Sequence, residues 1–270
     1  MWALKLLLIP IFLYLAILVA LYFGQTSMIF PARAVQGAGP LPPGAQPLSV
    51  ETADGETLRG LHIPPSRAGK GTLVLGFGGN AWNAQAAADY LHNLYPEADV
   101  VVFHYRGYRP STGKPSGAAL MADAPLVLDA AFARLRPTRT VAVGFSIGSG
   151  VAASLAGKRP LAGLILVTPF DSLAGVGAGH YPWLPVRLLF RHEMKPARWL
   201  AETATPTAIL AGETDTLIPP ARTDALRRAT RNLVYDRTIS GSGHNDIYDR
   251  PDFRAAMREA LAAVEGASHL

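Results

Sequence analysis

The chain has 270 residues, of which 49% are hydrophobic and 17% are charged. Its length suits one large domain, and its apolar content excludes a disordered chain, because so much apolar surface must be buried in a core. Cysteine is absent, which excludes disulfide bonds, thiolate metal sites and cysteine nucleophiles, and the net charge of +5 comes from scattered basic residues, which predicts no nucleic-acid partner.

The first element is a long apolar segment. Residues 6–23 carry no charged side chain, and as a helix they would cover roughly 27 Å of hydrocarbon. We predict an uncleaved transmembrane signal anchor over residues 1–30, with a cleaved signal peptide and a buried core helix as alternatives. Lys5 precedes the apolar run and only Arg33 follows it soon, so the positive-inside rule favours a single-pass protein whose main domain lies outside the cytoplasm. The excess of arginine over lysine, 20 to 5, favours a bacterial source and hence the bacterial inner membrane.

A linker and one domain follow the anchor. Residues 31–47 are rich in proline, glycine and alanine and predict an extended tether that separates the anchor from the domain. The domain is predicted to cover residues 48–270 and to open with a β-hairpin around Asp54 and Gly55. Further strands are predicted at residues 72–77, 99–105, 140–145, 163–167, 207–211 and 233–239. Alanine-rich helical segments lie between these strands, which indicates a three-layer α/β fold with a mostly parallel central sheet.

An insertion interrupts this alternation late in the chain. Residues 172–200 separate one strand from the next by about thirty residues and have aromatic residues and prolines at their centre. We predict that this insertion forms a short cap. There is no internal repeat and no second domain.

Ser146 is the predicted nucleophile. It lies in the sequence Gly144-Phe145-Ser146-Ile147-Gly148, between an apolar strand and a helix predicted over residues 149–158, which is the context of a nucleophile elbow. The serine of such a turn is strained, and side chains in place of Gly144 or Gly148 would collide with the neighbouring strand and helix. The alternative is a glycine-rich turn that only packs the helix on the strand.

His244 is the predicted base. A serine hydroxyl is a poor nucleophile, so it needs a histidine within hydrogen-bond reach and an acid that holds the imidazole in one tautomer. His244 follows Gly243 in a loop after the last strand and before a helix predicted over residues 251–265, and such a loop can lay its side chain over the carboxyl edge of the sheet. The remaining histidines lack this placement: His62, His92, His104, His180, His192 and His269.

Asp215 is the predicted acid. It comes shortly after the strand predicted over residues 207–211, and the chain order is then serine, aspartate, histidine, which distinguishes this arrangement from other serine triads. Asp171, after the preceding strand, is the main alternative. The weaker alternatives are Glu213, Asp246 and Asp249.

The oxyanion hole and the substrate pocket are expected nearby. The backbone N–H of Ile147 is one predicted oxyanion donor, and Asn80 in the glycine-rich loop after the third strand is the other, with Ala81 as the alternative donor and a plain helix-capping turn as the alternative role. In the insertion we expect Tyr181, Trp183 and Leu184 to line an acyl pocket, although such a stripe is also typical of ordinary core.

These motifs resemble the α/β-hydrolase superfamily, specifically its membrane-anchored branch of small serine esterases, lysophospholipases and acyl-protein thioesterases. The likeness extends from about residue 24 to the C-terminus. Four further segments carry it: residues 25–31, 105–108, 168–173 and 243–246. The resemblance implies Ser146, Asp215 and His244 as the triad and Asn80 with Ile147 as oxyanion donors.

Two positions depart from the family pattern. Gly78 stands where the family has a histidine before Gly-Asn, and Arg109 stands where a glycine usually follows Tyr-Arg-Gly-Tyr. Neither departure removes a catalytic group, and their expected effect is on loop conformation and substrate choice.

The sequence thus predicts a serine hydrolase that cleaves carboxylic ester or thioester bonds of small-molecule or lipid-like acyl substrates, through an acyl-enzyme and without metal or cofactor. A serine peptidase of the same superfamily and a noncatalytic membrane-tethered binding module are the alternatives. The sequence carries no signal for the oligomeric state.

Overall fold

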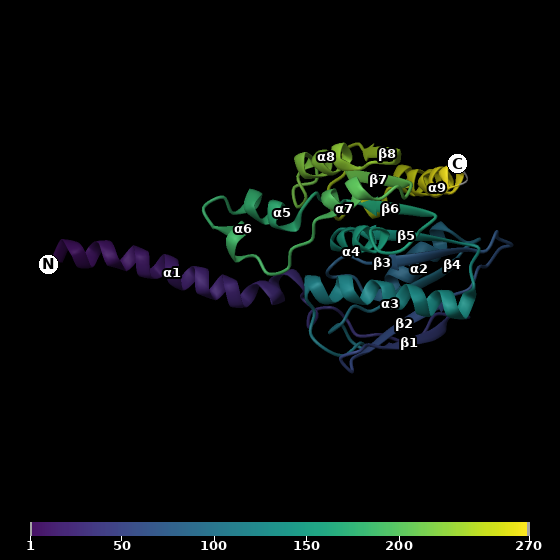
Figure 1. Cartoon of the computed structure of the whole chain (residues 1–270), viewed down its shortest axis with the longest axis horizontal. Coiled ribbons are helices and arrows are strands. Elements are labelled where there is room, and N and C mark those ends of the chain that lie inside the picture. Colours follow the sequence, from purple (N-terminus) through teal and green to yellow (C-terminus); the bar gives the residue numbers. More distant parts are fainter. Residues whose placement is uncertain (1, 269–270) are drawn as a thin grey trace.

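The first helix projects from the body of the protein. The computed structural model describes residues 2–268, with side chains from residue 8 onward. Helix α1 (Trp2–Ile29) projects away from a body that holds the sheet and most of the other helices (Figure 1). Within α1, Leu8–Ile29 is long and apolar enough to cross a membrane, and only 6% of that window is buried. Helix α1 is therefore a candidate transmembrane span.

One eight-stranded sheet forms the centre of the body. Its strand order is β1-β2-β4-β3-β5-β6-β7-β8. Strand β2 pairs antiparallel with β1 and β4, and all other neighbours are parallel. The bounds are β1 (Gln46–Glu51), β2 (Thr57–Ile63), β3 (Thr72–Phe77), β4 (Asp99–Phe103), β5 (Arg139–Phe145), β6 (Gly163–Val167), β7 (Thr207–Gly212) and β8 (Leu233–Ile239). The predicted opening hairpin and mostly parallel sheet are confirmed.

Strand β4 is shorter than predicted. The sequence pattern extends the strand to Tyr105, but the strand ends at Phe103. The reason is a turn over residues 105–108, in which the Tyr108 N–H donates to the Tyr105 carbonyl. This turn aims two tyrosines back at the loop after β3, with consequences described below.

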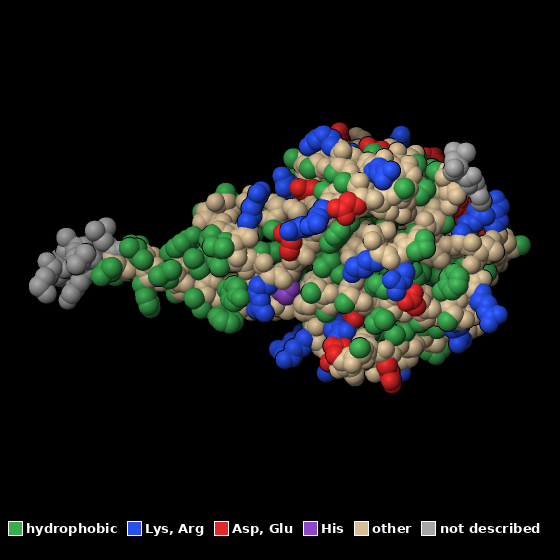
Figure 2. All heavy atoms as spheres, in the orientation of Figure 1, with side chains coloured by type: hydrophobic (Ala, Val, Ile, Leu, Met, Phe, Trp, Pro, Cys, Tyr) green, Lys and Arg blue, Asp and Glu red, His purple; other side chains and the backbone are tan. Residues whose placement is uncertain are grey.

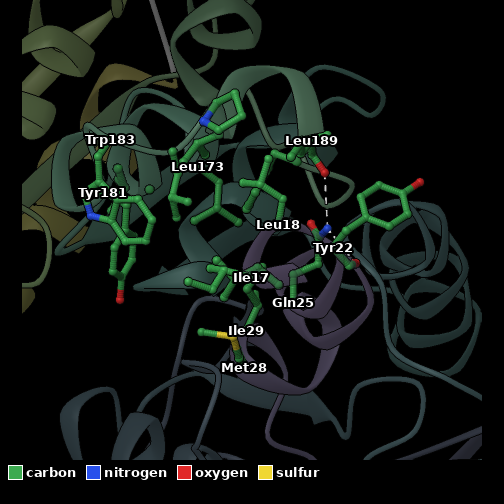
Figure 3. Close-up of a pocket in the computed structure, with 17 residues that line it drawn as sticks. Ile17, Leu18, Tyr22, Gln25, Met28, Ile29, Leu173, Tyr181, Trp183 and Leu189 are labelled. Carbon is green, nitrogen blue, oxygen red and sulfur yellow. Dashed lines mark hydrogen bonds between the residues drawn. The ribbon is translucent and has the colours of Figure 1, made fainter. Parts of the chain in front are cut away.

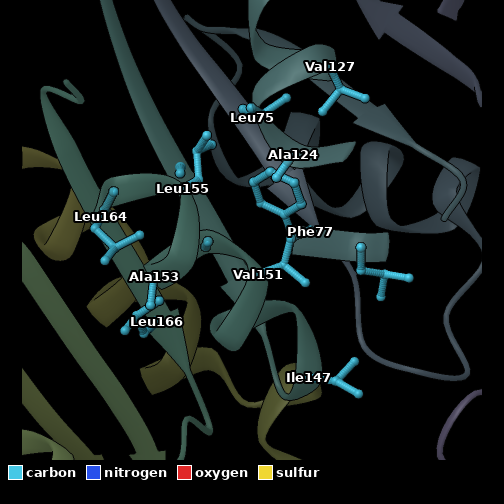
Figure 4. Close-up of a cluster of buried hydrophobic side chains, with 14 of the residues drawn as sticks. Leu75, Phe77, Ala124, Val127, Ile147, Val151, Ala153, Leu155, Leu164 and Leu166 are labelled. Atoms are coloured by element: carbon cyan, nitrogen blue, oxygen red, sulfur yellow. The ribbon is translucent and has the colours of Figure 1, made fainter. Parts of the chain in front are cut away.

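Helices cover both faces of the sheet. Helices α2 and α9 pack on one face, and α3, α4, α7 and α8 pack on the other. The bounds are α2 (Ala84–Leu94), α3 (Gly117–Leu135), α4 (Ile147–Ala156), α7 (Pro196–Glu202), α8 (Pro220–Ala229) and α9 (Pro251–Ala267). On β3, Leu73 and Leu75 join the α3–α4 core shown in Figure 4, whereas Val74 joins the α2–α9 core. Both faces of the strand are thus buried, which explains its unbroken apolar sequence.

The insertion between β6 and β7 has two different parts. Helix α7 packs against α4 and buries Leu200, so it belongs to the domain core. Helices α5 (Leu173–His180) and α6 (Val186–Leu189) instead extend beside α1 (Figure 1). We use the word cap for residues 172–190. The cap reaches the carboxyl edge of the sheet, because His180 Nε2 lies 2.8 Å from the Leu217 carbonyl in the loop after β7.

The linker differs from the predicted tether. Phe30, the first residue after α1, is buried in the domain core, and the Thr26 hydroxyl lies 2.8 Å from His192 Nε2. Further along, the Asn83 side-chain amide donates to the Gln36 carbonyl at 2.8 Å. This proline- and glycine-rich segment has little secondary structure of its own, so domain side chains satisfy its backbone groups. The end of α1 is therefore fixed to the domain and is not separated from it by an extended tether.

A buried ion pair joins the loop after β4 to α3. The Arg106 guanidinium donates to both carboxylate oxygens of Asp123, at 3.0 and 2.7 Å, and both side chains are about nine-tenths buried. This hydrogen bonding to Asp123 raises the pKa of Arg106 above its usual range. The pair holds the turn over residues 105–108 against the helix layer.

Candidate active site

Ser146 lies in a strained turn between β5 and α4. Its φ of 51° is in the left-handed region, which side-chain-bearing residues seldom adopt. A Cβ at Gly148 would overlap the carbonyl oxygens of Phe77 and Gly78, and a Cβ at Gly144 would lie 2.5 Å from the Gly148 carbonyl oxygen. The steric role predicted for the two glycines is confirmed, and helix α4 begins at Ile147, two residues before its predicted start.

His244 and Asp215 meet Ser146 at the carboxyl edge of the sheet. The loop after β8 places His244 Nε2 2.9 Å from Ser146 Oγ, and His244 Nδ1 lies 2.7 Å from Asp215 Oδ2. Asp215 comes from the loop after β7, and both side chains are buried. The second oxygen of Asp215, Oδ1, accepts the backbone N–H groups of Leu217 and Ile218 at 2.9 and 2.7 Å. A carboxylate held in this way accepts a hydrogen bond from Nδ1–H, which keeps the proton on Nδ1 and leaves Nε2 free to accept from the serine.

The alternative acids have other partners. Asp171 accepts from Arg222 at 3.2 Å, and Glu213 accepts from Ser240 and Gly241. Asp246 accepts from the Gly243 N–H within its own loop. Asp249 lies in a short 3-10 helix (Ile247–Asp249) after His244. The structure therefore brings Asp215, and none of these four carboxylates, to His244. Among the histidines that the sequence analysis excluded as the base, His269 lies outside the described residues.

The loop after β3 lies beside the elbow. A Cβ at Gly79 would come within 3.8 Å of Ser146 Cβ. Across the residues that the structure describes, neither the backbone N–H of Asn80 nor that of Ile147, at the first position of α4, has a hydrogen-bond acceptor. The Asn80 side chain points elsewhere, because its amide donates to the Ile29 carbonyl at 3.1 Å. Asn80 can therefore offer an oxyanion only its backbone N–H.

Two tyrosines support this loop, and the sequence analysis assigned them no role. The Tyr105 hydroxyl donates to the Gly78 carbonyl at 2.8 Å, and the Tyr108 hydroxyl donates to the Asn80 carbonyl at 2.8 Å. Burial raises the pKa of Tyr105 well above its usual range, so the hydroxyl remains a donor. These two bonds fix the 78–79 and 80–81 peptide groups, which lie on either side of the peptide that carries the Asn80 N–H. The sequence signal for these two tyrosines was the Tyr-Arg-Gly-Tyr motif. It supported the family resemblance but did not indicate that the tyrosines contact the loop after β3.

Replacing Tyr108 with Phe removes one of these supports. Among the described residues, Tyr108 is the only one whose side chain donates to the Asn80 carbonyl. A hydrogen bond of this kind contributes about 1 kcal/mol, so we expect kcat to fall about fivefold to tenfold with little change in KM. Tyr235→Phe is the matched control, since the Tyr235 hydroxyl bonds an exposed Glu259 far from the elbow. Steady-state kinetics on a soluble ester measures both, and equal kcat values for the two variants would contradict the supporting role.

The predicted pocket residues lie in the cap rather than beside the triad. Tyr181, Trp183 and Leu184 line a cavity of about 420 Å³ between the cap and α1. Ser146, His244 and Asp215 do not line it, but Ile29 does, and Ile29 is bonded to Asn80. The three residues are thus partly exposed cap residues and not ordinary core.

Comparison with known proteins decides the family. A family model described as the alpha/beta hydrolase fold matches residues 73–194. A Mycobacterium tuberculosis protein, named as uncharacterized, is 36% identical over 220 residues, which cover 77% of this chain and 78% of the relative. The chain belongs to the α/β-hydrolase superfamily.

Other α/β hydrolases with assigned activities are more distant. An esterase of Pyrococcus furiosus has a similar structure, with a TM-score of 0.67 and 16% identity over 85% of this chain and 96% of the esterase. The lysophosphatidylserine lipase ABHD12 of Xenopus tropicalis is 28% identical over 196 residues, which cover 62% of this chain and 50% of that lipase. The fold and these relatives support a hydrolase.

Proposed function

We propose that this α/β hydrolase is a serine hydrolase that cleaves carboxylic ester or thioester bonds of lipid-like or acylated substrates. The observation that carries the proposal is the contact series from Ser146 Oγ through His244 to Asp215, at 2.9 and 2.7 Å, in a nucleophile elbow. The order of these three residues along the chain matches that of the superfamily's triads.

The mechanism follows from the donors and acceptors in place. His244 Nε2 takes the Ser146 proton as Oγ attacks the acyl carbon, and Asp215 stabilises the imidazolium that forms. The backbone N–H groups of Asn80 and Ile147 stabilise the negative charge that develops on the acyl oxygen. His244 then gives the proton to the leaving alcohol or thiol. Water, deprotonated by His244, releases the acid from Ser146.

Membrane attachment is part of the proposal. We infer that residues 1–30 are a signal anchor, that residues 31–47 join it to the catalytic domain of residues 48–270, and that this domain lies outside the cytoplasm of a bacterial cell. The apolar helix Leu8–Ile29 supports the anchor. Attachment raises the local concentration of membrane-derived substrates, which favours lipid-like esters. The ABHD12 relative, a lysophosphatidylserine lipase by name, supports the same substrate class.

The test is labelling of the full-length protein in membranes with a fluorophosphonate probe. We expect the wild type to be labelled and Ser146→Ala to be unlabelled at an unchanged thermal midpoint, because only an activated serine reacts with the probe. Ser154→Ala is the matched control, since Ser154 is a buried serine two turns further along the same helix, and it should keep wild-type labelling.

Labelling of Ser146→Ala at the wild-type level would overturn the assignment of the nucleophile. Absence of labelling in folded wild-type protein would favour the noncatalytic binding module. Faster turnover of peptides than of esters and thioesters would favour the serine peptidase.

A further inference from the structure

The cap lies along the apolar stretch of α1 and not beyond its end. The Tyr14 hydroxyl donates to the Trp183 carbonyl at 3.0 Å, and the Gln25 side-chain amide donates to the Leu189 carbonyl at 3.2 Å. Tyr14 and Gln25 are separated by roughly 16 Å along a helix at 1.5 Å per residue. The cap therefore runs beside about half of Leu8–Ile29.

A bilayer crossed by α1 must then contain the cap. The hydrocarbon core of a bilayer is about 30 Å thick, and a helix of the length of Leu8–Ile29 covers roughly 33 Å. Wherever the hydrocarbon core of the bilayer is placed along Leu8–Ile29, it therefore contains most of the helix from Tyr14 to Gln25. Helices α5 and α6 accordingly lie in the leaflet next to the domain.

The outer surface of the cap suits lipid better than water. Leu188, which does not line the cavity between the cap and α1, is 82% exposed, and the cavity-lining residues Trp183 and Tyr181 are also 56% and 46% exposed. Figure 2 shows hydrophobic side chains gathered over the projecting part of α1 and the neighbouring surface. Arg187 is the one Lys, Arg, Asp or Glu in residues 173–190, and its long side chain can extend to the headgroup level. Exposed apolar side chains in such number mark a surface that contacts something apolar.

Other protein groups satisfy part of the backbone of the irregular segment of the cap. Non-helical backbone is tolerated at membrane depth only where other protein groups satisfy it. Residues 181–185 join α5 to α6, and two of them are prolines, which have no N–H. The Trp183 carbonyl accepts from Tyr14, and the Tyr181 carbonyl accepts from the Leu184 N–H at 3.0 Å.

Between the cap and α1 lies the cavity of about 420 Å³, within the range of about 300 to 1,000 Å³ typical of small-molecule sites. Figure 3 shows Ile17 and Leu18 of α1 facing the side of the cap that carries Leu173 and Leu189. None of the described residues that line it is charged. The Gln25 amide is occupied, because it donates to Leu189 and accepts from the Arg191 N–H. The walls are therefore apolar.

The inner end of this cavity adjoins the reaction site. Ile29 lines the cavity, and its carbonyl accepts from the Asn80 side chain, whose backbone N–H is the proposed oxyanion donor. A chain that filled the cavity would thus have its head close to Ser146.

We propose that this cavity binds an acyl chain of a membrane lipid, which enters sideways from the leaflet that holds the cap. The inference rests on the proposed function, because the bound lipid is the substrate of Ser146. The lipid ester bond breaks as the acyl group bonds to Ser146 Oγ, and the lipid alcohol leaves with the proton carried by His244. Water then releases the fatty acid, so no further reactant is needed.

The first test measures the depth of the cap and needs no catalysis. Because the chain has no cysteine, a fluorophore can be attached to Leu188→Cys or, as the matched control, to Phe132→Cys, an exposed apolar residue on α3. Both changes are made in full-length Ser146→Ala protein reconstituted in phosphatidylcholine vesicles. We expect lipids with a nitroxide on the acyl chain to quench the Leu188 label at least twofold and aqueous iodide to quench the Phe132 label. Iodide quenching of both labels would overturn the placement of the cap.

The second test fills the cavity. Leu21→Trp adds bulk to a residue that lines it, and Ala20→Trp adds the same side chain to a neighbouring exposed residue that does not. We expect Leu21→Trp to lower kcat/KM for a dodecanoyl ester at least tenfold more than for an acetyl ester, and Ala20→Trp to keep the wild-type ratio.

The outcomes separate the two proposals. An unchanged ratio of long-chain to short-chain turnover in Leu21→Trp would overturn the acyl site while leaving the hydrolase intact. Failure of the wild type to turn over either ester would contradict the proposed function itself, and the quenching result would still report whether the cap lies in lipid.

Discussion

Asp215→Asn is expected to lower kcat by about 10⁴-fold while leaving the fold intact. In the wild type, Oδ1 accepts two backbone N–H groups and Oδ2 accepts from His244 Nδ1. In the variant, the two N–H groups bind the amide oxygen, which turns the amide NH₂ toward Nδ1. His244 must then carry its proton on Nε2, where it cannot accept the proton of Ser146. Steady-state kinetics on an activated ester measures the loss.

Asp171→Asn is the matched control for that prediction. Asp171 was the main alternative acid by sequence, and it bonds Arg222 rather than His244. We expect its kcat to stay within a few-fold of the wild type. A loss of similar size in both variants, at unchanged thermal midpoints, would show that Asp215 is not the specific partner of His244.

Asp123→Ala is expected to lower the free energy of unfolding by about 3 kcal/mol, the low end of the range for breaking a buried ion pair, because the buried Arg106 guanidinium loses its bidentate partner and keeps only its bond to the more exposed Asp54. The loss should appear as a lower urea midpoint with an unchanged slope. Asp129→Ala, also on α3, removes a partner of Arg159 in a surface pair and should cost far less. Equal losses in the two variants would mean that burial does not decide the contribution of the Asp123 pair.

The strands and the elbow were predictable because their signals are local. Each strand carries its apolar pattern within five to seven residues, and β3, β6 and β8 begin and end where the pattern does. Gly144 and Gly148 are required by contacts within the elbow and with the adjacent loop, so a five-residue motif records them. The limit of local signals is clear at β4, whose apolar pattern continues past the turn that ends the strand.

The linker shows why amino-acid composition predicts tertiary contacts less well than a local motif predicts a turn or a strand. Proline and glycine in residues 31–47 indicate the absence of regular structure, and the segment has little of it. Composition does not record whether such a segment contacts the domain. Here Phe30, just before the linker, is buried in the core, and the Asn83 side-chain amide donates to the Gln36 carbonyl within the linker. Contacts with distant residues thus hold the segment after α1 against the domain.

By itself, the sequence determined the α/β alternation, the apolar helix that can cross a membrane, and the candidate serine, histidine and acids, because periodicity and motif spacing act over a few residues. The tertiary structure alone decided which carboxylate meets His244, which tyrosines support the loop at Asn80, and that the cap lies along α1. These contacts join residues from 27 to 169 positions apart. They depend on how the crossovers bring the loops to one edge of the sheet. A pattern of a few neighbouring residues does not encode contacts between residues so far apart in the sequence.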